Sequence, residues 1–313
     1  MPLVPFNDLL LAARRCGYAV CYSESWDLES FKAMVEAAEE CSAPMIAGFN
    51  GSFLRHPGRA QPERLTYYAA LRFALERCRV PAAFLLNESD DLEQMREAID
   101  LGFTAVMPEN EGLPLAQYRE LVTEVVQYAH PRGVAVEAQL GTLPLGGHLD
   151  EHPGELTDPD LARAFVEDTG VDALAVSIGN VHILTRGTAA LDFASLRNIH
   201  EKVDVPLVVH GGSGLPPESI GTLISLGVAK LNYGTVLKQA YLAALAGTLP
   251  RYRFPMSPHE FLDMGGSSDI LVAAREAVKT KAKELLVLSG SVERAGNHIG
   301  PRFLPPMVPS RER

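Results

Sequence analysis

The chain has 313 residues, of which 47% are hydrophobic and 21% are charged, a composition typical of a soluble globular protein. Its 28 Lys and Arg residues are outnumbered by 39 Asp and Glu residues, so the formal net charge is −11. This charge argues against nucleic acid as a partner, and no stretch approaches the roughly 18 apolar residues that a membrane helix needs.

The N-terminal segment and the cysteines predict a cytoplasmic protein. Residues 1–8 lack the basic and apolar regions of a secretory signal peptide. Cys16, Cys21, Cys41 and Cys78 have neither metal-type nor disulfide-framework spacing. We therefore expect reduced thiols and a cytoplasmic location.

Apolar runs typical of strands alternate with helical patterns along most of the chain. The strands are predicted at residues 18–22, 44–49, 81–86, 104–107, 134–138, 173–178, 207–209 and 229–232. The helices between and after them are predicted at 28–41, 62–79, 91–101, 115–130, 161–169, 193–203, 218–226 and 236–246. Several strands are continuous apolar runs, which favours parallel strands covered by helices. Eight such units predict an α/β fold of the (β/α)₈, or TIM barrel, type.

The C-terminal part of the chain adds one more helical pattern, at residues 270–288, and then a proline-rich segment. We expect residues 1–289 to form a single barrel domain with this extra helix. Residues 290–313 are predicted to form an extended tail that lies over the surface or over a neighbouring subunit.

Two insertions interrupt the alternation. Residues 141–159 follow the fifth strand and exceed an ordinary βα connection, so they predict a lid. His148 and His152 within them have a metal-like spacing, but the Pro-Gly pair that follows argues against a helix and a stable metal site there. Residues 248–267 show no clear periodicity and are interpreted as a solvated surface loop.

Polar side chains gather where the predicted strands end, which is the end that carries the active site in this type of barrel. We predict that Glu88, His182 and His210 converge there. Two imidazoles and one carboxylate suit zinc, or another divalent metal, with a position left for substrate. Glu137 on the fifth strand is placed to orient one of these ligands or to bind the metal in another state. The alternative for His182 is a core histidine bonded to the backbone.

A glycine-rich turn follows the seventh strand and leads into a helix. Glycines let the backbone approach a ligand closely, and free N–H groups at a helix start attract anions. With the end of the eighth strand, this turn matches the common phosphate site of the barrel. The predicted phosphate-binding residues are Gly179, Arg186, Gly211, Gly212, Ser213, Asn232 and Thr235. The alternatives are that the glycines only form a tight turn and that Asn232 and Thr235 cap the next helix.

In these residues the chain resembles the class II, metal-dependent fructose-bisphosphate and tagatose-bisphosphate aldolases. The segments that carry the resemblance are 136–141, 156–159, 169–182, 191–193 and 209–214. The resemblance implies that His182 and His210 occupy the positions of zinc-binding histidines. It also implies a phosphorylated small-molecule substrate, reversible carbon–carbon cleavage with zinc as a Lewis acid, and a homodimer or homotetramer.

The chain departs from the family pattern at several site positions. The family ends its third strand in Asp-His, where the Asp transfers a proton and the His is the third zinc ligand, whereas this chain has Asn87 and Glu88. Asparagine does not exchange a proton near neutral pH, and losing one general acid or base costs roughly 10²–10⁴-fold in rate. Gln139 replaces a second carboxylate, and Ile183 follows His182 where the family has glycine.

Two further departures are Glu24, which stands where the family has Asn, and Arg186, which stands for a lysine. Three hypotheses follow. The first is a metal-dependent aldolase or lyase for a different phosphorylated or carboxylated substrate, with Glu24 or Glu109 as the base. The second is a catalytically inactive homologue that binds sugar phosphate or supports a partner. The third is a metal-free isomerase or epimerase on the same barrel.

Overall fold

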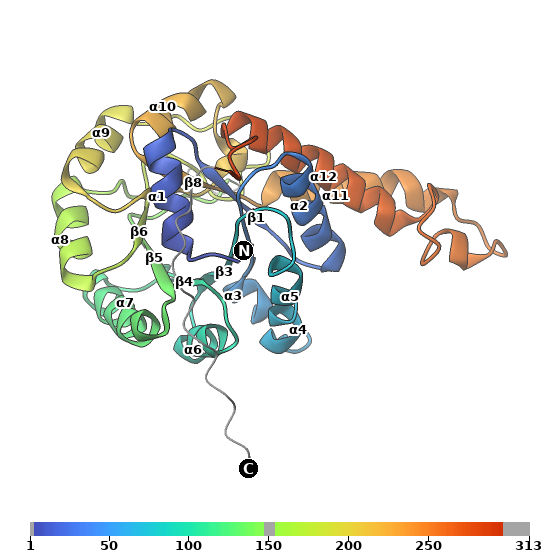
Figure 1. The fold of residues 1–313 in the computed structure, drawn as a ribbon, viewed down its shortest axis with the longest axis horizontal. Helices are drawn as coiled ribbons and strands as arrows, with labels where there is room; N and C mark the ends of the chain where they lie inside the picture. Colours follow the sequence, from blue (N-terminus) through green and yellow to red (C-terminus); the bar gives the residue numbers. More distant parts are fainter. Residues whose placement is uncertain (1–2, 147–153, 297–313) are drawn as a thin grey trace, which may run out of the picture.

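The computed structural model describes residues 3–146 and 154–296 and shows a closed barrel of eight parallel strands (Figure 1). Neighbouring strands follow one another in chain order round the barrel, and β8 pairs with β1. The strands are β1 Val20–Glu24, β2 Met45–Asn50, β3 Ala82–Ser89, β4 Ala105–Pro108, β5 Ala135–Leu140, β6 Ala173–Val176, β7 Leu207–Val209 and β8 Val228–Tyr233. This confirms the predicted (β/α)₈ fold class.

Helices surround the barrel, and some of them are capped by a side chain at their start. Asp27 accepts a hydrogen bond from the backbone N–H of Ser30 at 2.7 Å, and Asp158 and Asp269 cap two later helices in the same way. The α-helices in the described residues are α1 Phe6–Cys16, α2 Leu28–Glu40, α3 Gly51–Leu54, α4 Leu65–Ala69, α5 Arg72–Leu75, α6 Leu92–Asp100, α7 Leu115–Ala129, α8 Pro159–Thr169, α9 Phe193–Lys202, α10 Ile220–Ser225, α11 Thr235–Thr248 and α12 Ile270–Leu288.

The barrel has an outer core between strands and helices and an inner core enclosed by the strands. Inward side chains such as Ile46, Leu85 and Val208 fill the inner core. Helix α1 adds Phe6 and Leu9 to this cluster and lies across one end of the barrel (Figure 1). Helix α1 is not among the predicted helices, although its buried residues recur at the helical spacing i, i+3, i+4 and i+7.

Several predicted element boundaries differ from the structure, and β1, predicted at 18–22, spans Val20–Glu24. The helix predicted at 62–79 is divided into α4 and α5, because i→i+3 hydrogen bonds such as Leu71 N–H to the Tyr68 carbonyl interrupt the α-helical pattern. Strand β3 continues to Ser89, past the predicted end at residue 86. Strand β6 ends at Val176, two residues earlier than predicted. The extension of β3 brings Asn87 and Glu88 into the sheet.

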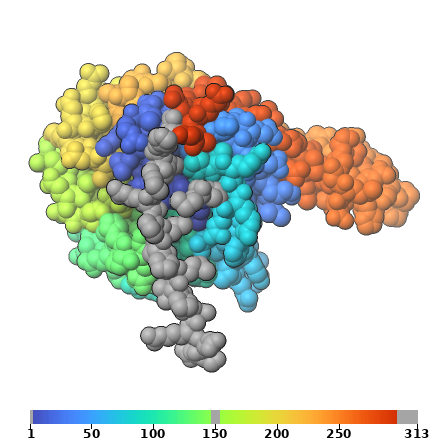
Figure 2. Space-filling view, in the orientation of Figure 1, coloured from blue at the N-terminus to red at the C-terminus, as the bar shows by residue number. Residues whose placement is uncertain are grey.

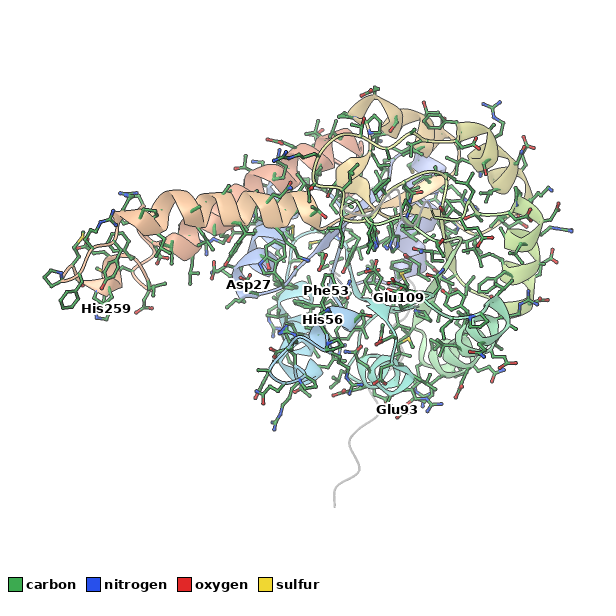
Figure 3. All side chains as sticks on the ribbon, turned by 180° about the vertical axis from the view of Figure 1, so that it is seen from behind. Asp27, Phe53, His56, Glu93, Glu109 and His259 are labelled. Carbon is green, nitrogen blue, oxygen red and sulfur yellow. The ribbon has the colours of Figure 1, made fainter. Side chains whose placement is uncertain are left out.

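Helices α11 and α12 form a hairpin that projects from the rounded body of the barrel (Figures 1 and 2). Near the barrel, α12 also packs against α2, where Nη1 of Arg275 lies 3.0 Å from Oε2 of Glu29. The insertion predicted as a solvated loop joins the two helices at the far end, and most of it is exposed. His259 marks this end in Figure 3, far from Phe53 and Glu109 over the barrel.

Part of the predicted tail returns to the barrel, since the backbone N–H of Glu293 donates to the Cys41 carbonyl at 2.9 Å. Residues 297–313 of the tail, and His148 and His152 of the predicted lid, lie outside the described residues. The division into a domain at 1–289 and a tail at 290–313 remains a proposal. None of the described helices is both long and apolar enough to cross a membrane.

We predict that Phe6→Ala lowers the free energy of unfolding by about 3–5 kcal/mol, because it removes a fully buried ring from the inner core. Leu11→Ala on the exposed face of the same helix is the matched control and should change it by less than about 1 kcal/mol. Urea titrations followed by circular dichroism measure both. Equal losses in the two variants would show that α1 does not complete the inner core.

Candidate metal centre and ligand cavity

Glu88 is presented to the barrel mouth by an irregular end of β3. The register with β4 shifts between Leu86 and Ser89, and Glu88 has a φ of 52°, in the left-handed region. Its backbone carbonyl accepts a hydrogen bond from Ser52 Oγ at 2.7 Å, and its Oε2 accepts one from Asn50 Nδ2 at 2.6 Å. These contacts hold a buried carboxylate in an unusual backbone conformation, which is typical of functional sites.

His210 and His182 reach the same carboxylate from two other strands. His210 directly follows β7, is 1% exposed, and places Nδ1 2.9 Å from Oε1 of Glu88. His182 lies in the loop after β6, with Nε2 3.5 Å from the same oxygen. Backbone hydrogen bonds of His182 with Pro144 and Gly146 attach this loop to the one that follows β5. The three side chains offer ligand atoms that all lie within 4.8 Å of one another.

Behind His210 lies a fully buried ion pair. Nζ of Lys230 on β8 is 2.8 Å from Oε2 of Glu137 on β5, and both side chains are 0% exposed. Oε1 of Glu137 is 3.0 Å from Nε2 of His210. Metal-binding histidines usually donate their second ring N–H to a carboxylate in this way. When Nε2–H of His210 donates to Glu137, Nδ1 beside Glu88 is the ring nitrogen that would bind a metal.

The charges in this cluster shift one another's pKa values. Burial opposes the charged form of Glu88, but His182 and His210 outweigh it and hold the Glu88 pKa well below its ordinary value. Burial also opposes the charge on His182, yet Glu88 beside it raises the His182 pKa to about 9. For Glu137, Lys230 and His210 overcome burial and lower the pKa of the carboxyl. The carboxylates are therefore ionised and available as ligands.

This donor set fits a divalent metal such as zinc. Two imidazoles and one carboxylate are a common three-residue set that leaves a coordination position for substrate. The ligand side chains converge on one point, and Glu137 supplies the hydrogen bond that orients His210. Glu88, His182 and His210 are the residues that would hold the ion.

A cavity of about 320 Å³ opens beside the cluster, and Glu88 and His182 form part of its wall. Of the predicted phosphate-binding residues, Gly211, Ser213, Asn232 and Thr235 line it. A Cβ atom at Gly211, where φ is 69°, would lie 2.2 Å from the Val181 carbonyl oxygen, so glycine is needed there.

The other predicted phosphate-binding residues lie outside the lining of this cavity. Gly179 and Gly212 pack against backbone oxygens. A Cβ atom added at Gly179 would lie 2.2 Å from the Ala190 carbonyl oxygen, and one added at Gly212 would lie 2.6 Å from the Asn232 carbonyl oxygen. The side chain of Arg186 is exposed. The structure therefore does not bring Arg186 to the cavity, and its role as a phosphate ligand stays a prediction.

The predicted proton-transfer positions differ in their surroundings. Asn87 and Glu24 line the cavity, whereas Glu109 does not. Glu109 Oε1 accepts a hydrogen bond from the backbone N–H of Asn110, and burial, with Glu88 nearby, raises the Glu109 pKa to about 7. Burial likewise raises the pKa of Glu24, although Lys238 lowers it. Nε2 of Gln139 donates a hydrogen bond to Oδ1 of Asn110 at 3.3 Å.

Sequence reasoning missed Tyr22, Lys230 and Lys238. Tyr22 and Lys238 line the cavity, and Lys230 bonds to Glu137. A signal existed for two of them, since Tyr22 precedes Glu24 and Lys230 precedes Asn232 by two residues. Side chains two apart on a strand point to the same side, so both had to face the barrel interior. Lys238 follows Gly234 by one helical turn.

Fold and site together define a (β/α)₈ barrel with a candidate metal centre beside a ligand cavity at its mouth. The family model described as class II fructose-bisphosphate aldolase matches residues 4–294. A fructose-bisphosphate aldolase of Staphylococcus epidermidis is 33% identical over 303 residues, which cover 94% of this chain and 100% of the relative. One of Geobacillus stearothermophilus is 34% identical over 270 residues, covering 85% and 92%.

Among solved structures, the crystal structure of the YdjI aldolase from Escherichia coli K12 matches with a TM-score of 0.76 and 28% identity, covering 94% of this chain and 99% of that one. The chain belongs to the class II fructose-bisphosphate aldolase family, which confirms the resemblance seen in the sequence. Members of this family are metal-dependent lyases of sugar phosphates.

We predict that Lys230→Met lowers the free energy of unfolding by about 3–5 kcal/mol, because Glu137 then keeps a buried charge without its ammonium partner. Adding Glu137→Gln should restore part of that loss. Lys32→Met is the matched control, since Lys32 pairs with Glu29 at the surface and should contribute less than about 1 kcal/mol. Denaturant titration measures all three variants, and similar losses for both lysines would contradict the assignment.

Proposed function

We propose that the protein is a zinc-dependent aldolase that cleaves a carbon–carbon bond of a phosphorylated ketose, with an altered set of acid/base residues. The observation that carries this proposal is the convergence of Glu88, His182 and His210 beside a cavity that also contains Gly211 and Ser213. Metal ligands and an anion cradle at one barrel mouth suit a substrate with both a carbonyl and a phosphate.

When bound, the metal would act as a Lewis acid that polarises the substrate carbonyl. The protein residues orient and bind. Glu137 fixes the ring of His210, while the backbone at Gly211 and the hydroxyls of Ser213 and Thr235 receive the phosphate. Asn87 can exchange hydrogen bonds with a substrate hydroxyl, but it does not take up a proton near neutral pH. Proton transfer then falls to Glu24 or Glu109, whose pKa values burial raises.

Asn87 also supports a second candidate function. A family member without the usual acid at this position can serve as a sugar-phosphate-binding protein that supports a partner. The two candidates differ in a direct assay, because only the aldolase releases a triose phosphate from a phosphorylated ketose.

We also propose that the protein is cytoplasmic and forms a homodimer or homotetramer. Large apolar side chains stay exposed along the hairpin of α11 and α12 and support self-association. They include Leu242, Leu249, Phe254, Leu262 and Met264.

We expect purified protein to contain about one zinc per chain, because the Glu/His/His set leaves a position open as catalytic zinc sites do. The double variant His182→Ala/His210→Ala should lose the metal, while His56→Ala, which changes an exposed histidine, should retain it. Elemental analysis by mass spectrometry gives the ratio. Metal-free protein from zinc-supplemented cells, or equal metal in all variants, would refute the site.

Restoring the family pair at the end of β3 tests the altered chemistry. We predict that Asn87→Asp/Glu88→His raises the rate of triose phosphate release from a phosphorylated ketose by roughly 10²-fold, because a proton-transfer group returns. Glu88→His alone, which restores only the third imidazole ligand, should give a much smaller gain. A coupled assay with a triose phosphate dehydrogenase measures both. No gain in the double variant would mean that proton transfer does not depend on position 87.

A further inference from the structure

The cavity contains a carboxylate, a negatively charged group that does not favour the binding of a phosphate. Glu24 ends β1 and points into the cavity, where its side chain is 13% exposed. A Cβ atom at Gly234 would lie 2.4 Å from Oε2 of Glu24. Glu24 therefore occupies the space that a side chain at position 234 would fill. The glutamate at the end of β1 and the glycine that follows the neighbouring strand β8 form one structural feature.

Lys238 fixes the carboxylate of Glu24 in this position. Its Nζ lies 2.6 Å from Oε1 of Glu24 and 4.8 Å from the centre of the Phe53 ring. Among the described residues that line the cavity, Lys238 is the one Lys or Arg. Its charge is thus offset by Glu24. A second phosphate beside Lys238 would meet a carboxylate instead of an unpaired cation.

Three buried polar atoms of the cavity lining, Asn232 Oδ1 and two others, indicate what the ligand offers instead. The hydroxyl of Tyr22 and the amide oxygen of Asn87 are buried, and neither has a hydrogen-bond partner among the described residues. Buried polar groups are normally paired, and an unpaired one costs free energy. Hydroxyl groups can donate to Asn87 and Glu24 and can either donate to or accept from Tyr22. The rim above them is apolar at Phe53, Ile183 and Leu242.

We propose that Glu24, held by Lys238 and given room by Gly234, is a specificity-determining residue that selects an uncharged, hydroxylated end of the substrate and excludes a second phosphate. The substrate class is then a ketose monophosphate, whose single phosphate occupies the Gly211–Ser213 cradle and whose distal hydroxyls bind Glu24, Tyr22 and Asn87. This inference rests on the proposed function for the ligand being a sugar phosphate.

The test measures binding, so that it does not depend on catalysis or on whether Glu24 also moves a proton. The probes are a hexitol 1-phosphate and the corresponding hexitol 1,6-bisphosphate, which lack a carbonyl and cannot be cleaved. Calorimetric titration of the full-length, zinc-loaded protein gives both dissociation constants. We expect the monophosphate to bind about tenfold more tightly than the bisphosphate, because a carboxylate beside a phosphate dianion is repulsive.

Two variants change the feature in different ways. Glu24→Gln removes the charge with little change of shape, and Gly234→Ala displaces the carboxylate while both charges remain. Both should bring the ratio of the two dissociation constants close to one. Glu63→Gln is the control, since Glu63 pairs with Arg59 outside the cavity, and it should leave the ratio unchanged. Melting curves verify that each variant is folded.

Wild-type protein that binds the bisphosphate as tightly as the monophosphate would overturn the inference, and so would an unchanged ratio in Glu24→Gln. Cleavage of a ketose 1-phosphate is assayed separately. A monophosphate preference without any cleavage would contradict the aldolase proposal and leave the specificity assignment standing. Cleavage combined with a bisphosphate preference would support the aldolase proposal and contradict the specificity assignment.

Discussion

The structure depends on a chain of paired charges that crosses the barrel interior. Lys230 contacts Glu137, Glu137 contacts His210, and His210 contacts Glu88, so four strands contribute to one buried network. A buried charge without a partner costs several kcal/mol, so each member restricts the position of the next. The ring of His210 is therefore held with Nδ1 toward Glu88 and Nε2 toward Glu137. The same contacts that satisfy the buried charges also organise the candidate metal centre.

Much of the barrel and the cluster of ligands could be predicted from the sequence. The alternation of apolar strands and helices predicts a closed parallel barrel. Such a barrel brings residues 88, 182 and 210, which lie at or after the ends of their strands, to one rim. The partner of a buried lysine could not be predicted, because an apolar strand does not show which strand lies across the interior. Arg186 is close to His182 in sequence but exposed, whereas Lys238, on a helix, reaches the cavity.

The departures from the family pattern can be related to one another only when the three-dimensional structure is known. Glu24 is one of these departures, and Gly234 lies far from it in the chain. Closure of the barrel makes β1 and β8 neighbours, with Tyr22 opposite Asn232 in the register. The missing side chain at Gly234 then provides the volume that the carboxylate of Glu24 fills. A single sequence lacks this information, since it holds no record of which positions share a volume.

Two residues at the mouth of the barrel have a strained backbone conformation. Glu88 and Ile183 have φ values of 52° and 54°, a region that costs most residues about 1–3 kcal/mol and costs β-branched ones the most. Ile183 stands where the family has glycine, and its loop retains a backbone conformation that suits glycine. Hydrogen bonds of His182 with Pro144 and Gly146 hold that loop in place. The fold therefore accepts backbone strain at Ile183, and the apolar side chain of this residue lines the cavity.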